Sequence, residues 1–268
     1  MTTIHVWHCG QVYVDQALAF REKLLHPAPY TGILRPKSKK NWVPVSTYLI
    51  QHQKGNILID TGWSEEIRTS PKKHLGWFSH ALFKAKLLPG QSVREQLYAI
   101  GLRPKDLDIV LLSHLHVDHV SGIKDLIDSS KFLTSAIEWK SANKDVGYNR
   151  SMWQDVPIQT FEMETIPFGP YNKGIDLFQE GTVYLVFTPG HSKGLFSVMV
   201  KTDGGWVLIV SDVAYAERSW KESIIPGITS NAEEALRSLQ WVQQFSLRDD
   251  CRCILANHDP TIKPHIIT

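Results

Sequence analysis

Three imidazoles and one carboxylate lie within six residues, at His114, His116, Asp118 and His119. They directly follow the apolar run 108–113, which has the length of a β-strand. Residues i and i+2 of a strand or its exit loop project to one side, so His114 and His116 can reach one metal ion. A turn further along could direct Asp118 and His119 to a second metal, about 3.5 to 4 Å from the first. The alternative, a chance cluster of core or surface histidines, does not account for this density.

Three further candidate ligands each follow a different predicted strand. His191 comes after 182–188, Asp212 after 206–211 and His258 after 251–256. A sheet fixes the backbone while loops beyond the strand ends deliver side chains. The seven residues together complete ligand sets for two metals. The other histidines lack such a context and are interpreted as ordinary ones: His5, His8, His26, His52, His74, His80 and His265.

Strands and helices alternate along the chain, which predicts an α/β fold. Short runs rich in Val, Ile and aromatic residues predict buried strands. Ser92 and Glu95 have the spacing of a capping box, and Gly101 stands where a helix C-cap glycine belongs, which predicts a helix between them. Ser230 and Glu233 repeat the capping pattern before a second helix. Residues 71–88 show weaker helical periodicity. The strands are predicted at 56–60, 108–113, 182–188, 206–211 and 251–256.

The bulk composition predicts a single compact domain over 1–268 and excludes several partner classes. Of the 268 residues, 43% are apolar, which is enough for a core. Lys plus Arg (29) and Asp plus Glu (27) nearly cancel, so neither nucleic acid nor a membrane is an expected partner. No targeting or membrane-spanning run is present, which predicts a cytoplasmic protein. Cys9, Cys251 and Cys253 lack a CxxC spacing and are assigned to the core.

The chain resembles the metallo-β-lactamase fold superfamily over nearly its whole length. The resemblance rests on the HxHxDH pattern at 114–119 and on four shorter matches: Asp60-Thr61-Gly62, Thr188-Pro189-Gly190-His191, Ser211-Asp212 and the late His258. It implies an αββα sandwich, with two mixed β-sheets flanked by helices. It also implies that His114, His116 and His191 hold the first metal, that Asp118, His119 and His258 hold the second, and that Asp212 bridges them.

Within that superfamily, residues 91–119 and 212–215 resemble the N-acyl homoserine lactonases that degrade quorum-sensing signals. His258-Asp259 also matches the ending of that family. The resemblance implies a hydrolase that opens the lactone ring of an N-acyl homoserine lactone, and it places Tyr215 against the lactone. Two features depart from the family: Lys193 stands where many relatives have proline, and the segment 64–90 is longer and more basic than expected.

The implied chemistry is hydrolysis by a metal-bridging hydroxide, because two cations lower the pKa of a shared water to around 7. Tyr215 would donate to the lactone carbonyl, and Asp118 would carry a proton to the leaving alkoxide. The cofactors are then two divalent metal ions, with zinc expected first and iron, cobalt or manganese as alternatives. Asp60 is either a residue that orients a ligand histidine or a turn aspartate. Tyr215 is otherwise a packed aromatic residue.

Two alternatives to the lactonase hypothesis stay open. One is another esterase, thioesterase or phosphodiesterase with the same metals, and the other is a non-catalytic metal-binding module. The expected partner is a small-molecule lactone, with a homodimer as a further expected assembly. Six aromatic residues in poorly periodic segments could cover the site: Trp77, Phe78, Phe83, Trp139, Tyr148 and Trp153.

Overall fold

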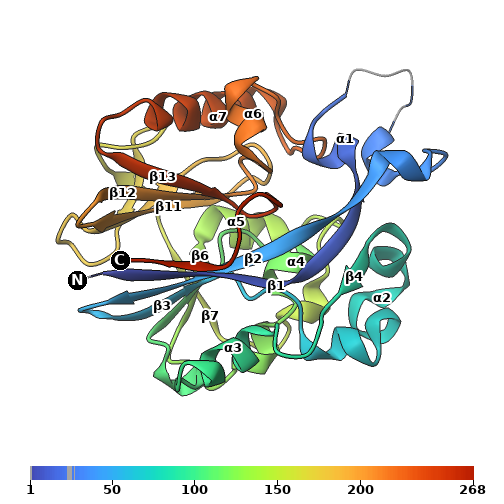
Figure 1. The fold of residues 1–268 in the computed structure, drawn as a ribbon, viewed down its shortest axis with the longest axis horizontal. Coiled ribbons are helices and arrows are strands. Elements are labelled where there is room, and N and C mark those ends of the chain that lie inside the picture. The colour runs from blue at the N-terminus through green and yellow to red at the C-terminus, as the bar shows by residue number, and fades with distance from the viewer. Residues whose placement is uncertain (1, 23–25, 27) are drawn as a thin grey trace. The chain divides into compact units, whose positions relative to one another are not determined.

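The structure is a computed structural model that describes residues 2–22, 26 and 28–268. Its chain forms two compact units, each of which contains one sheet (Figure 1). The first unit comprises Met1–Tyr13, Val43–Phe161 and Lys263–Thr268, and the second comprises Val14–Trp42 and Glu162–Ile262. Each unit is described separately below.

The sheet of the first unit has eight strands in the order β14-β1-β2-β3-β5-β6-β7, and β4 pairs with β1. It is mixed, because β3, β5, β6 and β7 run parallel whereas β2 and β3 form an antiparallel pair. In β3, the consecutive residues Ile57, Leu58 and Ile59 are fully buried, as expected for a strand covered on both faces. The strands are β1 (Thr3–Asp15), β2 (Lys40–His52), β3 (Gly55–Ile59), β4 (Lys84–Lys86), β5 (Ile109–Leu111), β6 (Phe132–Ser135), β7 (Ile158–Phe161) and β14 (His265–Ile267).

The helices of the first unit are short, and two of them, Val93–Ala99 and Ala136–Ala142, begin at serine side-chain caps. Ser92 and Glu95 form both bonds of the predicted capping box, and Gly101 follows the helix with a φ of +79°. The 3-10 turns are η3 (Glu65–Arg68), η4 (Pro104–Asp106), η5 (Ile123–Leu126) and η6 (Arg150–Met152). The α-helices are α2 (Pro71–Leu82), α3 (Val93–Ala99), α4 (Val117–Val120) and α5 (Ala136–Ala142).

The segment 71–88 differs from its predicted helix. Helix α2 ends at Leu82 and is broken at Gly76, whose φ of +73° and ψ of 162° are not helical. The helical pattern then stops because Lys84–Lys86 forms β4, which pairs antiparallel with β1. Glycine adopts a positive φ without the steric cost of a Cβ, so the break falls at the one residue of the helix best able to take it.

The sheet of the second unit has six strands in the order β13-β12-β11-β10-β9-β8. It is also mixed, because β12 and β13 are parallel and the other described pairs are antiparallel. The strands are β8 (Glu164–Thr165), β9 (Lys173–Asp176), β10 (Val183–Phe187), β11 (Phe196–Thr202), β12 (Gly205–Ser211) and β13 (Cys251–Ala256). Together with β3 and β5 of the first unit, β10, β12 and β13 confirm the five predicted strands.

Helix α7 (Ala232–Ser246) contacts β13, and its buried face joins the core formed by Leu208, Val210 and their neighbours (Figure 1). The predicted cap is shifted by one residue. Asn231 rather than Ser230 caps the helix, because the Asn231 side chain accepts from the backbone N–H groups of Glu233 and Glu234. The unit also contains α1 (Gln16–Ala19), α6 (Glu217–Lys221) and the 3-10 turns η1 (Pro29–Thr31) and η2 (Lys37–Lys39).

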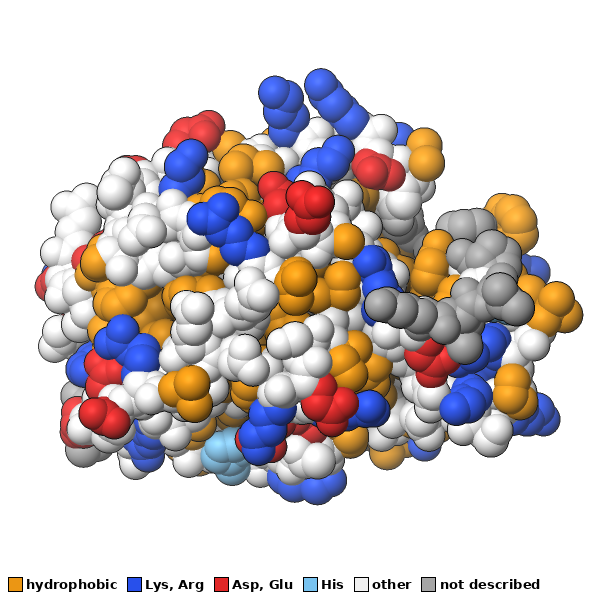
Figure 2. All heavy atoms as spheres, turned by 90° about the horizontal axis from the view of Figure 1, so that it is seen from above, with side chains coloured by type: hydrophobic (Ala, Val, Ile, Leu, Met, Phe, Trp, Pro, Cys, Tyr) orange, Lys and Arg blue, Asp and Glu red, His pale blue; other side chains and the backbone are white. Residues whose placement is uncertain are grey.

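Cysteines, surface charge and helix length test three further sequence predictions. All three cysteines are free; Cys9 is buried, but Cys251 and Cys253 are only partly buried, because β13 leaves that part of its length open. On the face shown in Figure 2, acidic and basic side chains are interspersed, in keeping with the near-neutral balance of charge. Among the described residues, no helix is both long and apolar enough to cross a membrane.

Candidate metal centre

The four clustered residues of the first unit follow β5. His114 and His116 lie in the loop beyond the strand, and His116 is the N-cap of α4. Asp118 and His119 lie within α4, so the turn expected after the strand is a short helix. His114 and His119 are fully buried, whereas the Asp118 side chain is 18% exposed. The loop and helix therefore present buried nitrogens and one carboxylate that solvent can reach.

Nitrogen atoms converge within this cluster. His114 Nε2 lies 3.0 Å from His116 Nδ1, and the rings of His114 and His119 have centroids 4.0 Å apart. Two nitrogens bound about 2.0 to 2.1 Å from one tetrahedral zinc ion would be roughly 3.3 Å apart. The observed nitrogen–nitrogen distance is close to that spacing.

Asp60 fixes the tautomers of two of these histidines, His119 directly and His114 through Ser113. Its Oδ2 lies 2.8 Å from His119 Nδ1, and since a carboxylate only accepts, Nδ1 carries the proton and Nε2 is left as the ligand atom. Ser113 Oγ donates to the same Oδ2 at 2.8 Å and thereby uses its one hydrogen. Ser113 Oγ therefore accepts from His114 Nδ1, 3.2 Å away, which leaves His114 Nε2 as a ligand atom as well. This geometry supports the orienting role for Asp60.

In the second unit, His191 is held by a tight turn after β10. Gly190 has a φ of +127°, and a Cβ added there would lie 2.1 Å from the backbone nitrogen of Ala235, so only glycine fits. The backbone N–H and Oγ of Ser230 both donate to the Gly190 carbonyl. His191 Nδ1 lies 3.0 Å from the carbonyl oxygen of Ile228, which can only accept, so Nδ1 carries the proton and Nε2 is the ligand atom.

Asp212 lies between two histidines of the same unit. It follows β12, and its Oδ2 is 3.4 Å from His191 Nε2 while its Oδ1 is 3.3 Å from His258 Nε2. Both distances match the separation of neighbouring ligands on one metal, roughly 3.3 Å. One carboxylate oxygen therefore faces each histidine, which is the arrangement that a bridging carboxylate needs.

Tyr215 is bonded to this carboxylate in the structure. Its hydroxyl donates to Asp212 Oδ2 at 2.9 Å, and its ring stacks on His258 with centroids 4.7 Å apart and planes at 22°. The side chain is buried, so Tyr215 is a packed aromatic residue whose hydroxyl lies within the candidate site. Tyr215 is thus packed as the alternative interpretation expected, but its hydroxyl bonds to a carboxylate, and its contact with a lactone stays a prediction.

The donor chemistry of both units fits a divalent transition metal. Imidazole nitrogens and carboxylate oxygens suit zinc, iron, cobalt and manganese. His114, His119 and His191 each have Nδ1 engaged by an oxygen. In metalloproteins, this pattern fixes the tautomer and the ring orientation of ligand histidines. The first unit holds His114, His116, Asp118 and His119 together, and the second holds His191, Asp212 and His258 together.

The model of the metallo-beta-lactamase superfamily matches residues 41–244 of this chain. The chain belongs to that superfamily. The match covers the HxHxDH cluster as well as His191 and Asp212, and His258 lies beyond it.

Curated relatives in this superfamily include the N-acyl homoserine lactonase AttM of Agrobacterium fabrum, which is 28% identical over 226 residues, 81% of this chain and 82% of that protein. An N-acyl homoserine lactonase of Bacillus cereus is 25% identical over 227 residues, 84% of this chain and 85% of that protein. A solved N-acyl homoserine lactone hydrolase with N-hexanoyl-L-homoserine bound at its metal centre has a TM-score of 0.76 at 22% identity and covers 96% of this chain and 93% of that chain. The metallo-β-lactamase fold predicted from the sequence, with two mixed sheets and flanking helices, is thereby confirmed.

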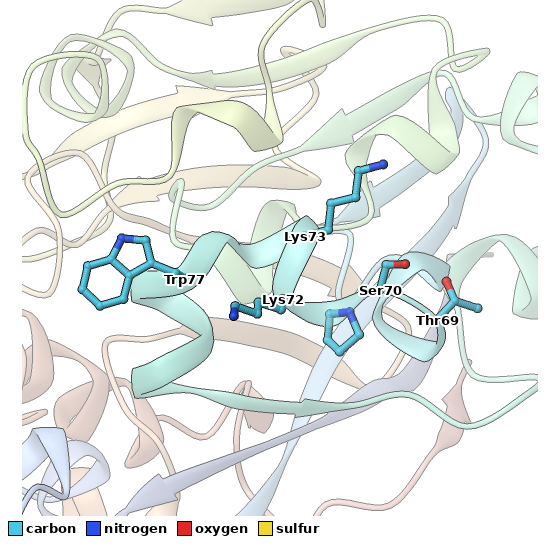
Figure 3. Close-up of a pocket in the computed structure, with 6 residues that line it drawn as sticks. Thr69, Ser70, Lys72, Lys73 and Trp77 are labelled. Atoms are coloured by element: carbon cyan, nitrogen blue, oxygen red, sulfur yellow. The ribbon is translucent and has the colours of Figure 1, made fainter.

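The aromatic residues expected to cover a metallo-β-lactamase site are placed unevenly. Trp77 is 74% exposed, Trp153 is buried, and the side chain of Phe78 lies outside the described residues. Trp77 lines a surface pocket of about 620 Å³ together with Lys72, Lys73 and the residues 69–71 (Figure 3). That lining contains none of the predicted ligands, and in the close-up Trp77 points away from the helix axis of α2.

Two further residues lie beside the HxHxDH cluster: Tyr148, which was among the aromatic residues expected to cover the site, and Glu138, which sequence reasoning missed. The Tyr148 ring lies against His116, with centroids 5.1 Å apart and planes at 34°. The fully buried Glu138 accepts from the backbone N–H of Leu115, which stands between the first two histidines. The pattern Ser135-x-x-Glu138 predicts only a helix cap, so no signal in the sequence connects Glu138 with the site.

Proposed function

We propose that this protein is a hydrolase that opens the lactone ring of N-acyl homoserine lactones at a dinuclear metal centre. The observation that carries the proposal is the tautomer arrangement: oxygens engage Nδ1 of three histidines and leave each Nε2 as a ligand atom. Several histidines prepared in this way indicate a metal site, because ligating histidines have their other ring nitrogen engaged by an oxygen. Curated relatives named as N-acyl homoserine lactonases point to the substrate class.

We infer the ligand sets from the resemblance and from the geometry within each unit. The first metal is held by His114, His116 and His191. The second is held by Asp118, His119 and His258, and Asp212 bridges both metals. Supporting this assignment, Asp212 has one oxygen near His191 and the other near His258, which belong to different sets.

When bound, the two cations activate a water as nucleophile and polarise the scissile carbonyl. Of the two proposed ligand carboxylates, Asp212 is buried and Asp118 is 18% exposed, so the Asp118 carboxylate can exchange a proton with solvent and pass it to the departing ring oxygen. Without substrate, the Tyr215 hydroxyl donates its hydrogen bond to Asp212. A lactone carbonyl placed beside Asp212 would receive that hydrogen bond as negative charge develops on its oxygen.

The proposal extends to the identity of the metal and to the setting of the enzyme. We infer zinc as the native metal, because His and Asp ligands suit it and because a neighbour of similar fold, with a TM-score of 0.63, is described as a dizinc quorum-quenching lactonase. A role in quorum quenching, a cytoplasmic location and a homodimer are further parts of the proposal, to be tested on the purified protein and in cells.

The proposal is tested with a substrate panel on metal-replete protein. Lactones with N-acyl chains should be hydrolysed in preference to thioesters, β-lactams and phosphodiesters, and elemental analysis should give about two metals per chain. His116→Ala should lose metal and activity together, whereas His80→Ala should lose neither. Preferential turnover of thioesters or phosphodiesters would replace the lactonase assignment by one of the other hydrolase classes, and a metal content of one would contradict the dinuclear centre.

A further inference from the structure

Glu138 uses one buried oxygen for two bonds beside the HxHxDH cluster. Its Oε1 accepts from the backbone N–H of Leu115 at 3.1 Å and from the hydroxyl of Tyr148 at 2.9 Å. Leu115 connects His114 to His116, so the first bond holds the backbone between two predicted ligands. The second bond holds the aromatic residue that lies against His116.

The position of Glu138 in the sequence makes this use of its carboxylate notable. Glu138 stands three residues after Ser135, the N-cap of α5, and Ser135 Oγ accepts from its backbone N–H. Glu95 has the same relation to Ser92, and there the glutamate returns its carboxylate to the N-cap backbone and completes a capping box. The Oε1 of Glu138 accepts from both Leu115 and Tyr148. A buried carboxylate is costly unless its hydrogen bonds are made, so a residue kept here needs a reason beyond helix capping.

His116 is held differently from the other ligand histidines. His114 and His119 are oriented through Nδ1 by oxygens of Ser113 and Asp60. In His116, by contrast, Nδ1 faces His114 Nε2. His116 would therefore bind the metal through Nδ1, the nitrogen that an oxygen engages in the other two rings. The His116 ring packs against Tyr148 at a tilt of 34°, and Tyr148 in turn meets Trp153 edge to face with centroids 6.4 Å apart.

We propose that Glu138 and Tyr148 are positioning residues that hold His116 in the orientation in which its Nδ1 binds the first metal. This inference rests on the proposed dinuclear centre and adds to it the means by which one ligand ring is fixed. The Tyr148 ring limits rotation of His116, the bond to Glu138 limits movement of Tyr148, and the same oxygen fixes the Leu115 backbone. A ligand ring that must be reoriented on binding gives weaker metal affinity, and loss of such supporting contacts lowers affinity roughly tenfold to a hundredfold.

The test is the affinity of the metal-free protein for Co²⁺, measured by competition with a chelator, together with the visible absorption of the bound Co²⁺. Tyr148→Leu removes the ring and should weaken binding of the first Co²⁺ roughly tenfold or more. Tyr148→Phe keeps the ring and loses only the anchor, and should weaken binding less, about threefold to tenfold. Glu138→Gln keeps an acceptor oxygen and should stay within about twofold of the wild type, whereas Glu138→Ala should resemble Tyr148→Leu.

Controls separate positioning from general stability. Tyr98→Phe alters a tyrosine that is 54% exposed on α3 and should leave Co²⁺ affinity unchanged. The absorption spectrum of bound Co²⁺ reports coordination geometry, so Tyr148→Phe should alter the spectrum even where the melting temperature of its metal-free form is that of the wild type. If Glu138→Ala fails to fold, the comparison of Tyr148→Phe with Glu138→Gln still decides the matter.

Wild-type Co²⁺ affinity and spectrum in both Tyr148 variants would overturn the inference. If the variants bind Co²⁺ more weakly but the wild-type protein does not hydrolyse lactones, the positioning role is supported and the proposed substrate is refuted. If the wild-type protein binds no Co²⁺ at all, the positioning role and the dinuclear centre fail together.

Discussion

Replacing Asp60 by asparagine should weaken both proposed metal sites, because Asp60 fixes one ligand histidine in each. The substitution changes only Oδ2 into an NH₂ group, and Asn is tolerated at the Asp60 backbone φ of +59°. The Asn Oδ1 can still accept from the backbone N–H of Ser113. The new NH₂ group, however, faces two partners that donate to Oδ2 in the wild type, His119 Nδ1 and Ser113 Oγ.

The expected magnitude follows from those two bonds. His119 would have to move its proton to Nε2 to accept from the amide, and it would then lose the lone pair that binds the second metal. A hydrogen bond to a charged group contributes about 1.5 to 3 kcal/mol, so affinity for that metal should fall roughly tenfold to 150-fold. Ser113 Oγ would accept from the amide and turn its own hydrogen toward His114 Nδ1. His114 would then also carry its proton on Nε2, and the first metal would be weakened through a neutral bond, by roughly twofold to tenfold.

The assay is stepwise chelator competition on metal-loaded protein, with Ser113→Ala as the matched variant. Ser113→Ala removes the bond to His114 but leaves Asp60 on His119, so it should weaken the first metal alone. Asp106→Asn is the control, because the Asp106 carboxylate accepts a backbone N–H but contacts no histidine. Wild-type affinity for both metals in Asp60→Asn would refute the tautomer argument, and so would Ser113→Ala losing both metals equally.

Three further outcomes are expected. Tyr215→Phe should keep both metals while lowering the lactone turnover number about tenfold to a hundredfold, because one oxyanion donor is lost where metals share the charge; unchanged kinetics would remove Tyr215 from the mechanism. The pKa of Glu95 is lowered to about 2, chiefly because Arg68 donates a hydrogen bond to its carboxylate. Because this pKa lies below the unfolded value, the Arg68–Glu95 pair stabilises the fold fully above about pH 4.3, and this stabilisation is lost as the pH falls toward 2. Denaturant titrations should therefore show Arg68→Ala less stable than the wild type by about 1 to 2 kcal/mol at pH 7, with a difference that shrinks in acid; a difference independent of pH would contradict this cause. Metal-loaded protein should unfold in one transition in calorimetry, because the proposed ligands come from both units, and two separated transitions would count against a single domain.

Local patterns predicted the elements that depend on local chemistry. The capping box at Ser92 forms as expected because all its partners lie within three residues of the cap. The second helix begins one residue later than predicted, because Ser230 is engaged by the distant Gly190 and leaves Asn231 to cap the helix. In the same way, Gly76 breaks a helix that the weak periodicity of its segment predicted. Each deviation arises from a contact or a backbone conformation that the periodicity of the sequence does not contain.

The candidate ligands were predictable because metal binding restricts the residue types and places them after strands. The groups that prepare those ligands were harder to predict, since they act over long separations. Asp60 is 59 residues from His119, and the carbonyl of Ile228 is 37 residues from His191. A carbonyl belongs to every residue and carries no signal of its own, and a strand-end aspartate has several ordinary roles, so the sequence left two roles open for Asp60.

Ser92-x-x-Glu95 and Ser135-x-x-Glu138 show why residue types alone do not settle the role of a carboxylate. Both pairs place a serine at the N-cap and a glutamate at the third helical position, and both serines accept from the glutamate N–H. Glu95 completes its cap and binds Arg68 near the surface, whereas Glu138 is fully buried and reaches Leu115 and Tyr148. The difference depends on which donors the fold brings to each helix start. Where a donor belongs to the backbone between two proposed metal ligands, the same four-residue pattern caps a helix and also supports the site.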